Sequence, residues 1–192
     1  SLWAAGIPVY VDQATTSAVQ TGTNVSGRVV AGVIHTLSAE VAETVSTMNV
    51  LVGDSVKANE ELARLDDTEI RNQLKSLKAR KTYLTAHLAL LEQRKIVREQ
   101  QLTRAESLNT RDLLTRDVTE QAELNIIQTE SDLVKTRYEL DEVNIQITDV
   151  ERQLRQTRIA AKTAGRVITI NVTEGQYVKP GDQLFRLLPD LG

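Results

Sequence analysis

Ninety-two consecutive residues, 67–158, contain neither glycine nor proline, which favours long helix over this half of the 192-residue chain. Within this block, residues 70–105 and 119–154 each hold eleven positions spaced alternately by four and three, and eight of each eleven are apolar. A mean period of 3.5 residues is that of a coiled-coil seam. The seam positions are Ile70, Leu74, Leu77, Lys81, Leu84, Leu88, Leu91, Lys95, Arg98, Leu102 and Ala105, then Thr119, Ala122, Ile126, Thr129, Leu133, Thr136, Leu140, Val143, Ile147, Val150 and Leu154.

A turn-forming stretch, Ser-Leu-Asn-Thr-Arg-Asp at 107–112, separates the two seams. We therefore expect an antiparallel helical hairpin with its turn near 108–113. Each arm of about 40 residues would extend roughly 60 Å. Leu84 and Leu88 should then face Leu133, Leu140 and their neighbours. The alternative is one continuous helix that dimerises with a second chain.

The segments on either side of the helical block repeat each other at an offset of 122 residues. Residues 50–65 and 172–187 are identical at seven of sixteen positions, and each copy carries a glycine-containing turn between two strand-like stretches. One copy is too small to bury a core, whereas two could form one sandwich. The pattern predicts that Val56 and Val178, and likewise Leu62 and Leu184, are buried in equivalent places.

The first eleven residues, Ser1–Val11, are apolar. Two interpretations remain open: the trimmed end of a membrane anchor, or an extended strand, since Pro8 and its β-branched neighbours disfavour a helix. No stretch of the chain reaches the ~18–20 apolar residues that span a bilayer.

Composition and motif content argue against most kinds of chemistry. The net charge of −3 disfavours nucleic-acid binding. The absence of cysteine excludes thiolate chemistry, and neither a phosphate-binding loop nor a catalytic triad is recognisable. His35 and His87 stand 52 residues apart, which gives little support for a metal site. We expect no enzyme activity and no metal.

Two half-motifs split by a helical hairpin resemble the periplasmic adaptor proteins of the HlyD type, also called membrane fusion proteins. The matching stretches are 53–57 with 62–66, and 164–167 with 174–184, and the resemblance covers roughly residues 34–188. It implies an α+β fold in which a long antiparallel coiled-coil hairpin is inserted between two halves of a lipoyl/biotinyl-like β-sandwich. The implied division is 1–33 N-terminal strands from a β-barrel-type or membrane-proximal domain, 34–66 first half, 67–158 hairpin, 159–188 second half, and 189–192 tail.

The resemblance also implies a function and partners. Such an adaptor links an inner-membrane transporter of the ABC, RND or MFS type to a TolC-type outer-membrane channel, for export of a drug, toxin or other substrate. It would lie in the periplasm, anchored to the inner membrane in its full-length form, and self-associate as a hexamer or trimer of dimers. The alternatives are a structural coiled-coil scaffold and, third, a carrier-domain protein. Because the hairpin occupies the turn where carrier domains bear their modified lysine, we expect no lipoyl or biotin cofactor.

Two features depart from the family pattern. Glu43 stands where the family often has glycine, so the first strand could begin differently. The chain ends at Gly192, just after the second half-motif, although the family builds its further domains mostly from later sequence. We therefore expect a fragment of a longer adaptor.

Three residues near the predicted turn match a spacing that resembles channel-docking adaptors. These have an arginine, a leucine four residues later and a serine seven after that; here the residues are Arg104, Leu108 and Thr115. The resemblance places them at the tip, against the channel mouth. Otherwise Arg104 is a solvated helix residue, Leu108 a last seam contact and Thr115 the N-cap of the second arm.

Apolar residues also repeat outside the seam. Ile127, Val134, Tyr138 and Ile145 are spaced by 7, 4 and 7 on the second arm, and Tyr83, Leu90 and Val97 by 7 on the first. A two-helix hairpin needs only one seam, so these favour lateral packing between neighbouring hairpins. Scattered surface apolar residues are the alternative.

Overall fold

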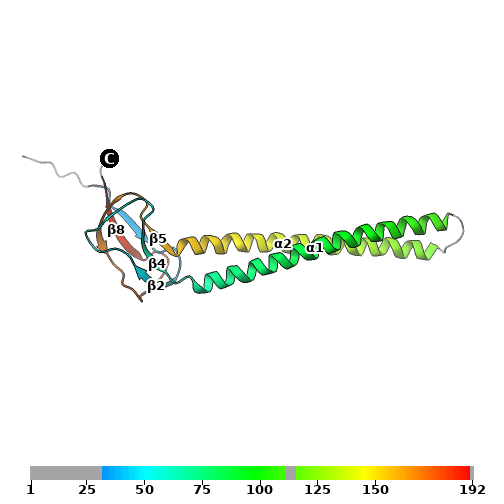
Figure 1. Ribbon diagram of the computed structural model, residues 1–192, viewed down its shortest axis with the longest axis horizontal. Coiled ribbons are helices and arrows are strands. Elements are labelled where there is room, and N and C mark those ends of the chain that lie inside the picture. Colours follow the sequence, from blue (N-terminus) through cyan, green and yellow to red (C-terminus); the bar gives the residue numbers. More distant parts are fainter. Residues whose placement is uncertain (1–31, 111–115, 191–192) are drawn as a thin grey trace, which may run out of the picture. The chain divides into compact units, whose positions relative to one another are not determined.

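The structure, a computed structural model, describes residues 32–110 and 116–190 and consists of two long helices and eight short strands in that range (Figure 1). In chain order the elements are β1 (His35–Ser38), β2 (Glu43–Met48), β3 (Ser55–Val56), β4 (Glu61–Leu65), α1 (Thr68–Asn109), α2 (Arg116–Gln156), β5 (Arg158–Ala160), β6 (Gly165–Ile170), β7 (Tyr177–Val178) and β8 (Gln183–Pro189). The N-terminal strands predicted within 1–33 fall almost entirely outside the described residues.

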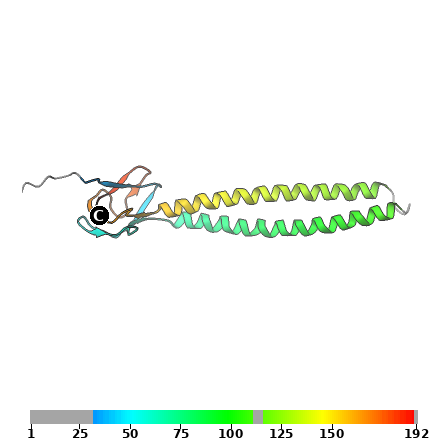
Figure 2. The same cartoon turned by 90° about the horizontal axis from the view of Figure 1, so that it is seen from above.

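The two helices pack against each other as the antiparallel arms of one hairpin (Figures 1 and 2). The predicted hairpin is therefore confirmed, and a single continuous helix is excluded. The start of the turn was predicted too early, because α1 continues through Asn109 and includes residues 107–109. Residues 111–115 lie outside the described residues.

The seam between the arms follows the predicted heptads. Leu84 is buried against Val143 and Ile147, and Leu140 packs on the same cluster. Leu88 is only half-buried. Leu84 therefore faces Leu140 and its neighbours, as expected. Leu133 is not in this cluster and lines a groove together with Lys95.

Leu84→Ala is expected to lower the free energy of unfolding of the hairpin by about 2–5 kcal/mol, because it removes a fully buried side chain from the seam. Leu124→Ala makes the same chemical change on the other arm, at an exposed position, and should stay within about 0.5 kcal/mol. Chemical denaturation followed by circular dichroism measures both. Equal effects would contradict the seam assignment.

The eight strands form two four-stranded sheets related by the 122-residue offset. The strand orders are β1-β8-β6-β3 and β5-β4-β2-β7. Adding 122 to the residue numbers of β2 and β3 gives the residue numbers of β6 and β7. Each sheet contains strands from both halves of the repeat, so neither half supplies all the strands of a sheet. The hairpin leaves after β4 and returns into β5, two strands that pair with each other.

One core lies between the sheets, as the repeat predicts. Val56, Val178, Leu62 and Leu184 are all at most 3% exposed and belong to one cluster, with Phe185 its largest side chain. The predicted fold class, with the hairpin inserted between two halves of a β-sandwich, is confirmed.

The glycine-containing turns of the two halves use the same hydrogen bonds. The Leu51 amide donates to Asp54 Oδ2 at 2.8 Å, and in the second half the Thr173 amide donates to Gln176 Oε1 at 3.1 Å. Gly53 and Gly175 adopt φ of +99° and +83°, a left-handed conformation that strains other residues. The shared glycine is therefore required by the turn itself.

Glu43 does not shift the start of its strand. It begins β2 just as its equivalent, Gly165, begins β6. A side chain at Gly165 would collide with the carbonyl oxygen of Leu188, because β8 continues to Pro189 alongside it. β4 instead ends at Leu65, where the chain turns toward α1, so Glu43 is tolerated.

Candidate docking and assembly surfaces

The far end of α1 presents the first two of the three predicted tip residues. Arg104 precedes the buried seam residue Ala105 and is exposed, and no carboxylate among the described residues forms an ion pair with it. Leu108, one turn further, is half-buried. Thr115 lies outside the described residues. Of the three, the structure therefore brings Arg104 and Leu108 together on one helix.

The seam becomes polar toward this end of the hairpin, a feature that the sequence analysis did not interpret. Arg98 donates to the Asn125 carbonyl oxygen and, at 2.6 Å, to the hydroxyl of Thr129, which is buried. Lys95 pairs with Glu130 at 2.8 Å across the arms. The hydrogen bond from Lys95 to Glu130 is the main cause of a raised pKa of Lys95. The signal in the sequence was the pair of consecutive seam positions occupied by basic residues, Lys95 and Arg98.

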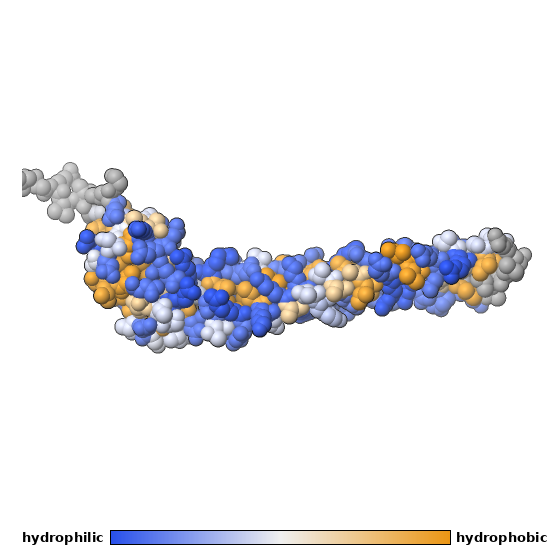
Figure 3. Space-filling model, viewed as in Figure 1, coloured by the Kyte–Doolittle hydropathy of each residue, from blue (hydrophilic) through white to orange (hydrophobic). Residues whose placement is uncertain are grey.

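The off-seam apolar residues are exposed on both arms. Their exposed fractions range from 51% for Val97 to 70% for Tyr138. The space-filling view shows apolar patches along the hairpin among hydrophilic residues (Figure 3). The full set is Tyr83, Leu90 and Val97 on α1, with Ile127, Val134, Tyr138 and Ile145 on α2.

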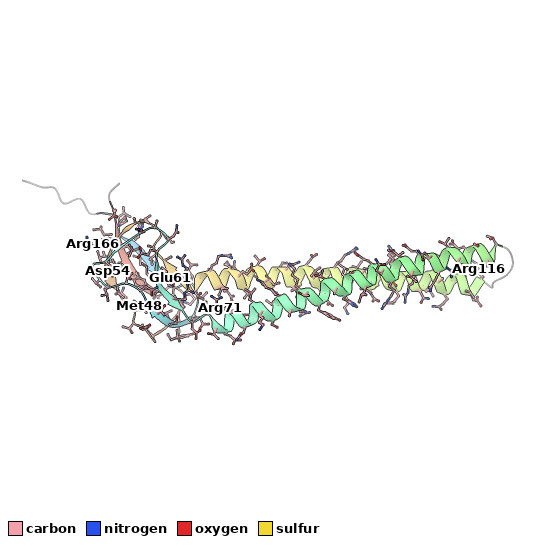
Figure 4. All side chains as sticks on the ribbon, in the orientation of Figure 1. Met48, Asp54, Glu61, Arg71, Arg116 and Arg166 are labelled. Atoms are coloured by element: carbon pink, nitrogen blue, oxygen red, sulfur yellow. The ribbon has the colours of Figure 1, made fainter. Side chains whose placement is uncertain are left out.

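Ion pairs join the two halves of the repeat at the root of the hairpin, where Glu61 lies (Figure 4). Arg64 contacts Glu61 at 2.6 Å and Arg158 contacts it at 3.0 Å, so one carboxylate links β4 to β5. The pKa of Glu61 lies below its ordinary value of 4.5, chiefly because of the hydrogen bond from Arg64; burial opposes this shift and Arg158 adds to it.

Glu61→Gln is expected to destabilise the β-sandwich at pH 7 by no more than about 1 kcal/mol, because the ion pairs are partly exposed. Because the pKa of Glu61 is lower in the folded state, the ionised carboxylate stabilises the fold at pH values above 4.5. This stabilisation is lost as the pH falls and the carboxylate of the folded chain takes up a proton. The difference from the unmodified chain should therefore vanish in acid. Denaturation at neutral pH and near pH 3 tests this, with the exposed Glu174→Gln as control. A pH-independent difference would contradict the assignment.

A basic cavity of about 550 Å³ opens beside the same root. Arg155 and Lys162 line it, and Glu40, also in its lining, accepts a hydrogen bond from Gln156 at 2.8 Å. Basic side chains at the C-terminal end of a helix complement its dipole, and α2 ends at Gln156. This accounts for Arg155, whereas Lys162 lies beyond the helix.

The two histidines lie in different elements. His35 Nδ1, in β1, is 3.2 Å from Thr163 Oγ1, and His87, in α1, stacks on Tyr83. Residues 32–110 and 116–190 hold no group of three or more potential metal ligands. In the same ranges neither helix has a stretch apolar enough to cross a bilayer.

The fold and the sequence both match known proteins. The family described as CzcB-like, barrel-sandwich hybrid domain matches residues 33–188. The chain belongs to this family. The resemblance to membrane fusion proteins is thereby confirmed.

Two curated relatives match the sequence. The macrolide export protein MacA of Escherichia coli O157:H7 is 27% identical over 161 residues, which are 79% of this chain and 41% of MacA. The same values hold for MacA of Shigella flexneri. The chain thus spans less than half the length of these curated relatives.

Solved structures show the same fold. The crystal structure of MacA from Actinobacillus actinomycetemcomitans superposes with a TM-score of 0.72 at 22% identity, over 82% of this chain and 51% of that one. The membrane fusion protein Spr0693 from Streptococcus pneumoniae R6 gives a TM-score of 0.54 at 14% identity, over 82% of this chain and 66% of that one. At these identities the likeness concerns the fold alone.

Proposed function

We propose that this chain is the hairpin and barrel-sandwich part of a periplasmic adaptor that links an inner-membrane transporter to a TolC-type outer-membrane channel. The observation that carries the proposal is the architecture: a two-part β-sandwich whose single insertion is a hairpin with arms of 42 and 41 residues. A relative that is 27% identical over 161 residues is a macrolide export protein. The exported cargo is a drug, a toxin or another substrate.

The mechanism is one of assembly. The sandwich anchors both ends of the hairpin, because β4 and β5 pair directly where the helices begin and end. The seam holds the arms together and so carries the tip away from the sandwich. Arg104 and Leu108, together with Thr115, would contact the channel mouth. The exposed apolar residues would pack neighbouring hairpins side by side around an export path.

Direct binding tests this function. The chain, immobilised through its C-terminus, is expected to bind a purified TolC-type channel in detergent. A second variant lacks residues 85–98 and 130–143, which are two heptads from each arm. It keeps the seam spacing, Arg104, Leu108 and the sandwich, and it tests in the full-length adaptor whether export depends on the length of the hairpin. Binding by neither protein, with the helices folded by circular dichroism, would favour the scaffold alternative.

A further inference from the structure

The seam between the arms changes its chemistry along the length of the hairpin. From the root as far as Leu91 on α1 and Leu133 on α2, its buried side chains are apolar except for that of Thr136. The remaining seam positions lie in the far segment, by which we mean residues 95–109 of α1 and 116–130 of α2. The seam therefore has an apolar part near the root and a second part of different composition toward the tip.

The far segment buries little apolar surface. Of its eight seam positions, only Leu102 and Ile126 carry large apolar side chains, and both are half-buried. The seam positions that are buried there carry the smaller side chains of Ala105 and Thr129. Because the hydrophobic effect scales with the apolar area removed from water, it holds the arms together less firmly here than around Leu84.

A polar network joins the two arms of the far segment. Nη1 of Arg98, which is half-buried, donates to the carbonyl oxygen of Asn125 and, at 2.6 Å, to the hydroxyl of Thr129. This hydroxyl donates to the same carbonyl oxygen at 2.9 Å, and Thr129 is only 1% exposed. Hydrogen bonds from a charged donor are about twice as strong as those between neutral groups. The network thus links α1 to α2 through the side chain of one residue, Arg98.

Few other polar contacts connect the arms of the far segment. Lys95 pairs with Glu130 at 2.8 Å, but the carboxylate is half exposed, and ion pairs in water contribute little. From Arg98 to the tip, the hydrogen bonds and the ion pair of the described residues otherwise stay within one helix. Isolated helices of about 15 residues are marginal in water, so each arm of the far segment depends on the other to remain helical.

We infer that the far segment opens and closes as a unit separate from the rest of the hairpin, and that Arg98 is the latch that keeps it closed. Release of Arg98 from Asn125 and Thr129 leaves these arms with few apolar contacts, whereas the seam around Leu84 is unaffected. Opening exposes the inner faces of both arms, so a partner that binds those faces shifts the chain toward the open form. The inference concerns the hairpin alone and does not depend on docking to a channel.

Hydrogen exchange, followed on the whole chain by mass spectrometry of overlapping peptides, tests this inference. Amides of one opening unit share one free energy of opening, so protection should drop in a single step on both arms where the far segment begins. Arg98→Ala is expected to accelerate exchange of the far segment on both arms at least about tenfold and to leave the rest of the hairpin unchanged. Arginine and alanine are both strong helix formers, so helix propensity would not explain such an effect.

Two further variants show whether the latch acts through its contacts. Arg94→Ala makes the same change one turn nearer the root, at an exposed position, and should leave exchange unchanged. Thr129→Val keeps the shape of the buried side chain and removes the hydroxyl that accepts from Arg98. It should accelerate exchange of the far segment in the otherwise unchanged chain, but not when Arg98 is already alanine, because the contact is then absent.

Several results would overturn the inference. Protection that falls gradually toward the tip would show ordinary fraying of helix ends, and one value over the whole hairpin would show that the far segment is no separate unit. Faster exchange or lost helicity over the whole hairpin of Arg98→Ala would show that the network supports more than the far segment. Equal effects of Arg94→Ala and Arg98→Ala would remove the latch, as would an effect of Thr129→Val that is the same with and without Arg98.

Discussion

Replacing Arg104 with aspartate is expected to weaken binding of the chain to a TolC-type channel at least about tenfold, or 1.4 kcal/mol, and to abolish export by the full-length adaptor. The guanidinium is exposed at the end of the hairpin and offers five donors in a rigid fork, which suits backbone carbonyls or carboxylates of a channel mouth. Aspartate reverses the charge and offers no donor. Helicity and melting temperature should change little, because the side chain makes no ion pair with the described residues and exposed substitutions rarely matter to stability.

A matched control separates docking from a general effect of charge reversal. Arg152→Asp makes the same change near the root, at an exposed position, and should leave channel binding intact. Unchanged export by Arg104→Asp would remove the docking assignment.

Phe185→Ala is expected to be the most damaging single substitution in the sandwich, at about 3–5 kcal/mol. Phe185 is 0% exposed and is the largest fully buried side chain among the described residues. Its equivalent in the other half of the repeat is Ala63, also buried, so the core has a large side chain on one side and a small one on the other. Truncation would leave alanine at both positions, and the remaining side chains could not fill the space.

The asymmetry of this core supplies a sharp control. The double variant Ala63→Phe with Phe185→Ala restores the total side-chain volume at the equivalent position and should recover part of the loss, whereas Ala63→Phe alone should overpack the core by about 1–3 kcal/mol. Chemical denaturation, with hydrogen exchange of the β-strand amides to separate sandwich from hairpin, measures all three. An effect of Phe185→Ala no larger than that of the exposed Tyr177→Ala would contradict the core assignment.

The hairpin and the sandwich were predictable because periodicity and repetition can be read directly from the order of residues along the chain. A 3.5-residue period places Leu84 and Val143 in a seam whatever the rest of the molecule does. The 122-residue repeat places Val56 and Val178 in equivalent positions because the same turn chemistry recurs around Gly53 and Gly175. The matched spacing of Arg104, Leu108 and Thr115 indicated a candidate tip by resemblance, and the docking role of all three residues stays a prediction.

Other features could not be read from the sequence, because they depend on which residues meet across the arms. The register of the seam decided that Leu84 packs on Val143 and Ile147 and not on Leu133. Arg98 donates to a backbone carbonyl of Asn125, an acceptor that every residue possesses and that no motif marks. α1 likewise continues to Asn109, although the residue types at 107–109 favour a turn.

The sequence by itself thus determined the elements, their pairing into one sandwich and the presence of extra apolar stripes, since each follows from a regular spacing along one chain. Only the tertiary structure decided the register of the arms, and with it that Leu84 packs on Val143 and Ile147. The physical reason is that sliding one arm past the other by a heptad preserves most of the apolar seam. The choice among such registers rests on the sandwich that holds both ends, together with cross-arm pairs such as Lys95–Glu130.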